Sequence, residues 1–198
     1  MAGSILYIPL GISKRFWIVI KIIFILLNVA QFYWISRASF THFNRGEKEP
    51  LQMLIIRALT TLGIIWNLYV AFAQNSASHQ IAAFAILTFI SSLIFASAIK
   101  ETKGKKLPVA FSFDKETTYV VTGIYRFIRH PFYASYIVYW LSWTSLNYKS
   151  ILSLTFSSLL IFAYLIAIRS EEQFLRKTYD LQYLAHKKIS ARVFPYLY

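Results

Sequence analysis

Apolar residues along the chain are gathered into five long blocks that alternate with polar segments. The blocks cover residues 16–35, 51–73, 81–99, 132–146 and 151–168. Most of them approach the roughly 20 residues that a helix needs to cross a bilayer. This pattern predicts an all-α integral membrane protein with about five transmembrane helices. The last two blocks are the shortest and are joined by a tight polar turn at 147–150, so we expect them to form a short helical hairpin.

The composition agrees with a membrane protein and excludes several other classes. Hydrophobic residues make up 57% of the 198 positions and charged residues only 15%, against about a quarter charged in ordinary soluble domains. The net charge of +13 would indicate a nucleic-acid partner only on a soluble domain with a basic face, and here the charges lie between the apolar blocks. The absence of cysteine excludes disulfides, thiolate metal sites and cysteine nucleophiles. We expect no metal site.

The positions of Lys and Arg predict the orientation in the membrane. With five spans, sixteen of the 21 Lys and Arg residues fall on one side and three on the other, while Lys21 and Arg57 lie inside spans or at their edges. Cytoplasmic loops carry the excess of positive charge, so the N-terminus is expected outside and the C-terminus inside. The first block is about 20 residues long and lacks a small-residue cleavage site, so we interpret it as a retained span.

The chain divides into two parts of different character. Residues 1–99 contain three spans with few polar residues and are interpreted as a transmembrane scaffold. Residues 100–198 contain the hairpin between two long polar cytoplasmic segments, where function is expected. Within the second polar segment, 171–188 is predicted to be an amphipathic helix with Phe174, Leu181 and Ala185 near one face. Neither a GxGxxG motif nor a P-loop occurs, so a Rossmann-type nucleotide site is not supported.

The first motif that can carry chemistry is Gly-Ile-Tyr-Arg-Phe-Ile-Arg-His-Pro-Phe-Tyr at 123–133, immediately before the fourth block. Pro131 disfavours a helical conformation at His130 and suits the first turn of a helix, so His130 is expected at a helix entrance. The N-terminus of that helix, together with Arg129, suits a ligand carboxylate or phosphate. The alternative is that the arginines and tyrosines of this motif are ordinary residues of the membrane interface.

The second motif is Arg169-Ser-Glu171-Glu172, directly after the fifth block. Two adjacent acids at a membrane boundary are destabilising unless they pair with cations or bind a cationic ligand, and Arg129 and Arg169 are the candidate partners. Because the hairpin returns the chain to the same side, His130 and Glu171 should lie at the same depth, which makes one site from two motifs. The alternative is a carboxylate cluster that merely favours a helix start.

Together these motifs resemble the isoprenylcysteine carboxyl methyltransferase family and its bacterial relatives. The resemblance rests on the 123–133 motif, Arg-x-Glu-Glu-x-x-Leu at 169–175, tyrosines at 179 and 183, and Arg-x-x-Pro at 192–195. It implies a membrane methyltransferase that binds S-adenosylmethionine on its cytoplasmic side and takes a lipophilic acceptor from the bilayer. Carried over by position, the cofactor-binding residues would be Tyr125, His130, Pro131, Tyr133, Glu171 and Tyr183, and the catalytic residues Arg129, Glu172 and Arg192.

The sequence leaves the acceptor open. The carboxylate of an isoprenylated cysteine and a lipid head group are both candidates, because Ile189-Ser-Ala replaces the Arg-Val-Pro that usually precedes the tail arginine. If the acceptor is an amine or a phenol, His130 or His186 would take its proton. Two alternatives to methyl transfer remain: an NADPH-dependent membrane reductase of the steroid or sterol type, which has a similar Arg-His-Pro-x-Tyr segment, and a non-catalytic membrane protein.

Overall fold

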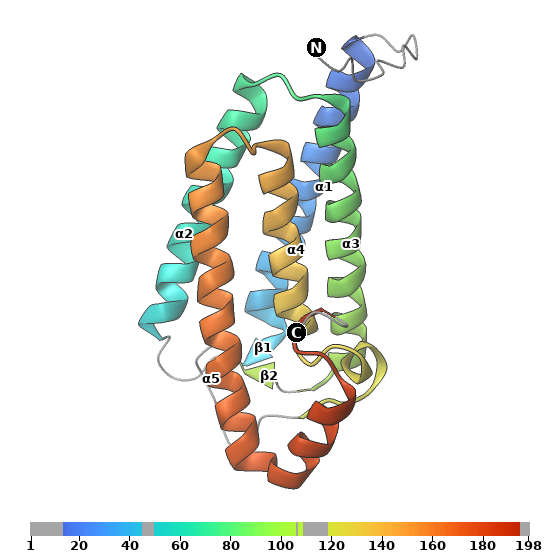
Figure 1. The fold of residues 1–198 in the computed structure, drawn as a ribbon, viewed down its shortest axis with the longest axis vertical. Coiled ribbons are helices and arrows are strands. Elements are labelled where there is room, and N and C mark those ends of the chain that lie inside the picture. The colour runs from blue at the N-terminus through green and yellow to red at the C-terminus, as the bar shows by residue number, and fades with distance from the viewer. Residues whose placement is uncertain (1–13, 45–49, 106, 109–118, 195–198) are drawn as a thin grey trace, which may run out of the picture.

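Five α-helices run side by side and alternate in direction along the molecule (Figure 1). The structure is a computed structural model that describes residues 14–44, 50–105, 107–108 and 119–194. The helices are α1 (Lys14–Thr41), α2 (Leu51–Ala73), α3 (Ser78–Thr102), α4 (Pro131–Leu146) and α5 (Ile151–Ile189), with a short 3₁₀ turn η1 (Gly123–Arg126). Two-residue strands β1 (Phe43–Asn44) and β2 (Leu107–Pro108) pair in parallel. The expected helical class is confirmed.

Four of these helices, α1, α2, α3 and α5, are long and apolar enough to cross a membrane, which agrees with a multi-pass membrane protein. The fourth predicted span, α4, has 16 residues and is therefore only about 24 Å long, so a fifth crossing stays a prediction. Twelve residues of α4 are buried, and the helix packs against α3 and α5. Burial on nearly every face explains why its sequence is apolar almost all round.

The predicted hairpin between α4 and α5 is present, and its turn is fixed by side chains. Ser150 caps the N-terminus of α5 by accepting a hydrogen bond from the Ser153 amide at 3.3 Å. The Trp66 indole donates to the same hydroxyl at 3.0 Å, and Asn147 donates to the Asn67 side chain at 2.8 Å. Both contacts join the turn to α2, so the hairpin is anchored at the end of the bundle remote from η1.

Neutral polar pairs also join the helices inside the bundle. Asn28 on α1 donates to Thr88 at 2.9 Å and to Ser142 at 3.2 Å, and thereby links α3 and α4. Gln31 donates to Ser91 at 2.7 Å one helical turn further on. Hydrogen bonds of this kind between helices are typical of membrane proteins.

Lys21, one of the two basic residues that fall within the spans, ties α1 to the end of α2. Its ammonium donates to the carbonyl oxygens of Ala71 at 2.8 Å and Gln74 at 3.0 Å. These are carbonyls of the last helical turn, which lack partners within the helix. A cation is favourable at that position because the helix dipole is negative there.

The C-terminal segment differs from the prediction. Residues 171–188 are not a separate amphipathic helix, because α5 runs on through them and kinks at Asp180 (φ 27°, ψ −99°) before folding back toward η1 (Figure 1). The expected apolar face is not confirmed, since Leu181 is 79% exposed and Ala185 is exposed. The kink interrupts the helical periodicity on which that face was assigned. The inward face instead carries Glu172, Leu175, Tyr183 and His186.

Candidate active site

Backbone hydrogen bonds bring the two motifs together. After the kink in α5 the chain returns alongside the segment between η1 and α4. The Arg129 amide donates to the Ala191 carbonyl at 2.9 Å, the Ala191 amide donates to the Phe127 carbonyl at 2.9 Å, and the His130 amide donates to the Arg192 carbonyl at 3.2 Å. The tail is therefore paired with the Arg-His-Pro segment as a short strand would be.

Pro131 and Gly123 shape the first motif. His130 precedes α4 with φ −123° and ψ 62°, and Pro131 occupies the first helical position, so His130 lies at the helix entrance as the sequence predicted. Gly123 begins η1 with φ 57°, and a Cβ at this position would overlap the side chain of Glu101. Glycine is therefore required there both by its backbone conformation and by the lack of space.

Glu172 is surrounded by basic side chains. Its carboxylate lies 3.2 Å from Arg129 Nη2, 2.8 Å from Arg192 Nη2 and 3.5 Å from His130 Nε2. The side chains of Glu172 and Arg129 are only 10% and 7% exposed, and Arg129 also donates to the Ser190 carbonyl. A buried carboxylate is tolerated when guanidinium groups neutralise it and satisfy its oxygens. Glu172 therefore holds the tail, through Arg192, against the Arg-His-Pro segment.

Glu171 has a different environment from its neighbour. Its carboxylate lies 3.7 Å from His130 Nδ1 and within hydrogen-bonding reach of the Tyr133 hydroxyl. The expected proximity of His130 and Glu171 is confirmed, whereas the expected pairing of Arg169 is wrong: in the described part of the chain this exposed arginine forms no ion pair with either acid. The helix turns Ile168 and Glu172 inward, which leaves Arg169 on the outer face.

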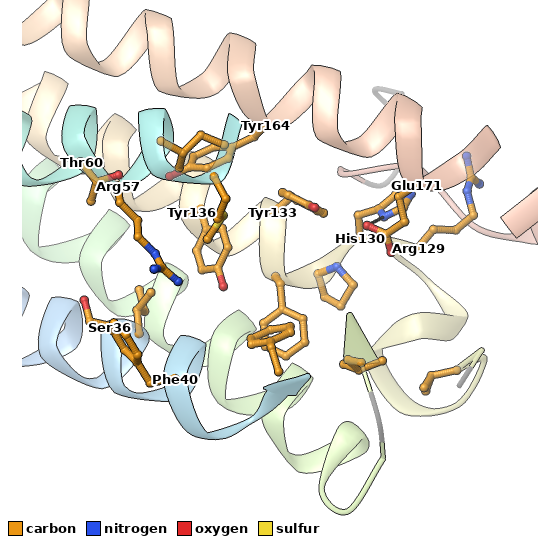
Figure 2. A pocket seen from close by; sticks show the side chains of 18 of the residues that line it. Ser36, Phe40, Arg57, Thr60, Arg129, His130, Tyr133, Tyr136, Tyr164 and Glu171 are labelled. Carbon is orange, nitrogen blue, oxygen red and sulfur yellow. Dashed lines mark ion pairs between the residues drawn. The ribbon is translucent and has the colours of Figure 1, made fainter. Parts of the chain in front are cut away.

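A single cavity of about 310 Å³ connects this charged site to the interior of the bundle. Figure 2 shows its two ends, one with Arg129, His130 and Glu171 and the other with Ser36, Phe40, Arg57 and Thr60. Tyr133, Tyr136 and Tyr164 line the part between them. The cavity is partly open and receives side chains from α1, α2, α4 and α5. It is therefore lined both by the predicted scaffold, residues 1–99, and by the second part of the chain, residues 100–198.

The nine site residues predicted from the sequence fall into two groups in the structure. Those that line the cavity are Tyr125, Arg129, His130, Pro131, Tyr133 and Glu171. Glu172, Arg192 and Tyr183 do not line it; the first two form the ion-pair cluster, and Tyr183 lies within hydrogen-bonding reach of Glu172. The structure thus gathers all nine into one neighbourhood, and their individual roles stay predictions.

His186 holds the segment that carries Tyr125. Its Nε2 donates to the Tyr125 carbonyl at 2.7 Å, and its Nδ1 lies 2.6 Å from the Tyr119 hydroxyl. A carbonyl only accepts hydrogen bonds, so Nε2 carries the proton and Nδ1 accepts from the phenol. Burial raises the pKa of Tyr119 above its ordinary value, which favours the protonated phenol. Because both ring nitrogens are engaged and His186 does not line the cavity, His130 is the better placed of the two candidate proton acceptors.

Several cavity residues were not found from the sequence. Arg57, the one charged residue of α2, belongs to neither sequence motif. Tyr136 and Tyr164 were not separable from the other aromatic residues of their helices, and Tyr119 lay outside both motifs. The signal for Arg57 was present, because an ionisable residue in an apolar span marks a functional site.

Comparison with known proteins agrees with the class of protein that the fold and the site indicate, a multi-pass membrane protein with a buried charged site. Residues 80–182, slightly more than half of the chain, match the model of the phospholipid methyltransferase family, and the chain belongs to this family of membrane methyltransferases. The resemblance to isoprenylcysteine carboxyl methyltransferases is thereby confirmed at the family level. The match includes the hairpin and both acids but ends before Arg192, and it gives no support to a reductase. No curated protein matches the chain.

Proposed function

We propose that the protein transfers a methyl group from S-adenosylmethionine to an amphiphilic acceptor held in the membrane. The observation that carries this proposal is the single cavity that joins the charged site of the two motifs to the apolar interior between α1, α2 and α4. A cofactor with charged groups and an acceptor with an apolar tail need different surroundings, and this cavity offers both. Membership of a methyltransferase family supplies the reaction class.

The residues at the charged end fit the cofactor. Glu171 lines the cavity, and its carboxylate suits the positive groups of S-adenosylmethionine. His130 lines the cavity beside Glu171, so its imidazole lies within reach of a ligand there. Arg129 and the first turn of α4 supply donors for the carboxylate of the cofactor. Tyr125 and Tyr133 add aromatic surface for the adenine.

The reaction needs alignment and a suitable charge environment. When bound, S-adenosylmethionine supplies an electrophilic methyl group. Glu171 would balance the positive charge of the cofactor, and its attraction is stronger than in bulk water because the site is partly buried. Holding the two substrates in line contributes several kcal/mol to catalysis. If the acceptor is an amine, His130 would hold the proton that the amine loses, while Glu172 keeps Arg129 and His130 in place.

The same proposal covers the acceptor and the orientation. The acceptor is a lipophilic molecule that enters from the bilayer, with a lipid head group favoured by the family and an isoprenylated cysteine as the other candidate. The end of the bundle that carries the site also holds the ends of α1 and α3 and the starts of α2 and α4 (Figure 1). The loops at this end contain most of the Lys and Arg residues, so we place it in the cytoplasm and the N-terminus outside.

The test is the thermal stability of the detergent-purified protein with S-adenosylmethionine, S-adenosylhomocysteine or NADPH added separately. A ligand that binds only the folded state stabilises it, so the adenosyl ligands should raise Tm and NADPH should not. Glu171→Gln should lose the increase. Asn147→Ala, which weakens the bundle at its other end, serves as the control and should keep it. A response to NADPH alone would contradict the proposal.

A further inference from the structure

Large apolar side chains are exposed on the segment that folds back after the kink in α5. Leu181 at the start of this segment is 79% exposed, and Ile189 at its end is 77% exposed. Phe127, whose carbonyl accepts a hydrogen bond from the Ala191 amide at 2.9 Å, is also exposed on the adjoining segment. None of the three apolar side chains belongs to an apolar block of the sequence, so a passage through the bilayer does not account for their exposure.

Distances along α5 place Ile189 and Leu181 at different depths. The apolar block of this helix ends at Ile168, and Glu172 follows it by about 6 Å along the axis. Glu172 binds Arg192 at 2.8 Å, so the end of the returning segment lies at that level, within a head-group layer about 5–8 Å thick. Leu181 follows the block by about 20 Å, next to the kink that forms the extreme end of the molecule (Figure 1). Ile189 therefore lies at head-group level and Leu181 in water.

Exposed basic side chains flank Phe127 and Ile189 on both segments. They are Arg126, Lys187 and Lys188. The carboxylate of Glu172 is buried and bound by arginines, so it does not offset this charge at the surface. Apolar side chains that enter the head-group layer beside basic ones are typical of interfacial membrane anchors. Each Lys or Arg near an anionic membrane surface adds to the attraction.

We propose that Phe127, Ile189 and their three basic neighbours form an interfacial anchor that binds the head-group layer of an anionic membrane surface. Phe127 and Ile189 contribute apolar contact, while Lys187 and Lys188 attract the lipid phosphates. The anchor adjoins the charged site, because Arg129 donates a hydrogen bond to the Lys187 carbonyl at 3.4 Å. Lipid bound at the anchor would therefore hold the segment that positions Arg129. This inference goes beyond the proposed function and depends on neither the cofactor nor the acceptor.

The experiment measures the depth of single nitroxide labels, since the chain contains no cysteine of its own. Ile189→Cys and Leu181→Cys are labelled separately and reconstituted in vesicles of phosphatidylcholine alone or of an equal mixture with phosphatidylglycerol. Leu181→Cys is the matched control, because both side chains are apolar, similarly exposed and on the same returning segment. Electron paramagnetic resonance compares collisions of each label with oxygen, which is enriched in the bilayer, and with a water-soluble nickel complex.

We expect the oxygen-to-nickel collision ratio in the mixed vesicles to be several-fold higher for the label at Ile189 than for the label at Leu181. The first label lies in the head-group layer and the second in water. In phosphatidylcholine alone the ratio at Ile189 should fall, because the surface no longer carries net negative charge. Equal ratios at the two positions in the mixed vesicles would overturn the anchor.

A pair of double variants, each combined with the label at Ile189, tests the basic side chains. Lys187→Gln/Lys188→Gln should lower the collision ratio toward that of the label at Leu181. Arg176→Gln/Lys177→Gln removes the same charge from exposed side chains of α5 before the kink, and it should leave the ratio unchanged. A high ratio in phosphatidylcholine alone that survives the loss of both anchor lysines would overturn the assignment to an anionic surface.

The labels also distinguish a lipid surface from a protein partner. Magnetic coupling between the labels of two chains would show that a second copy covers Ile189, and it would overturn the anchor. Lipid contact predicts no such coupling when the protein is reconstituted at low density.

Discussion

The two ends of the helical bundle are stabilised in different ways. At the end that holds the hairpin turn, neutral side chains pair across helices, as Asn147 does with Asn67, and the ammonium of Lys21 binds carbonyl oxygens. At the other end, carboxylates and guanidinium groups are gathered around Glu172 and the cavity. Neutral pairs stabilise a membrane bundle modestly and without the large penalty of buried charge. Carboxylates and guanidinium groups are therefore concentrated at the end of the bundle where a ligand is expected.

A second contrast lies within the charged end. Glu172 is neutralised by two arginines and does not line the cavity, whereas Glu171 lines the cavity and, among the described residues, has no arginine as an ion-pair partner. Two adjacent acids on one helix therefore have separate expected roles. Glu172 supports the local fold, and Glu171 meets the ligand.

The largest effect on stability is expected from Glu172→Ala. This change leaves Arg129 and Arg192 without their buried counter-charge, and removing one partner of a buried ion pair typically costs about 3–5 kcal/mol. The free energy of unfolding, measured by titration with a denaturing detergent, should fall by about 3 kcal/mol. The double variant Glu172→Ala/Arg192→Ala should recover part of this loss. An unchanged stability of the single variant would show that the cluster does not hold the tail.

Glu171→Gln should sharpen the contrast by affecting activity instead of stability. The substitution keeps the shape of the side chain but removes the charge opposite the cofactor, so methyl transfer should fall by about 100-fold, which corresponds to about 2.7 kcal/mol. Tm without ligand should change little. The measurement is the transfer of a tritiated methyl group from S-adenosylmethionine to organic-soluble product. Wild-type rates in this variant would remove Glu171 from the site.

Gly63→Ala should destabilise the packed interior. A Cβ at Gly63 on α2 would lie 2.9 Å from the ring of Trp140 on α4, which is fully buried. Overpacking of this kind costs about 1–3 kcal/mol. The free energy of unfolding should therefore fall by about 2 kcal/mol, and the smaller ring in Gly63→Ala/Trp140→Phe should restore part of it. No loss in the single variant would contradict the close approach of Trp140 to Gly63.

Asn147→Ala should have the smallest effect of these changes. It removes the hydrogen bonds from Asn147 to Asn67 and leaves the bond from Trp66 to Ser150. Hydrogen bonds of this kind contribute about 1 kcal/mol in membrane proteins. Stability should fall by about that amount, while the affinity for S-adenosylhomocysteine stays unchanged. A loss of cofactor affinity in this variant would mean that the two ends of the bundle are not separable.

The sequence predicted the elements that follow from local pattern. The block at 51–73 coincides with α2, and the turn at 147–150 separates α4 from α5. The proximity of His130 and Glu171 was predictable because the hairpin between them returns the chain to the same end of the bundle. These features depend on the lengths of the apolar blocks and on the turn residues between them, and both can be read from the sequence.

The remaining features depend on contacts between distant segments. The kink at Asp180 accompanies the backbone pairing of the tail with 127–130, which no local pattern indicates. The same fold-back turns Leu181 outward and brings Arg192 to Glu172. The choice of Tyr136 and Tyr164 as cavity residues is equally a matter of packing between helices, since many tyrosines of this chain have the same local surroundings in sequence.

Equilibrium dialysis of tritiated S-adenosylhomocysteine tests most directly whether the cavity binds the cofactor at its Glu171 end. The protein is placed in lipid nanodiscs, and Glu171→Gln and Asn147→Ala are compared with it. We predict one saturable site per chain in the unmodified protein and in Asn147→Ala, with a Kd about tenfold or more higher in Glu171→Gln, as expected for the loss of a charged partner. Equal affinity in Glu171→Gln, or no saturable binding by the unmodified protein, would contradict the account.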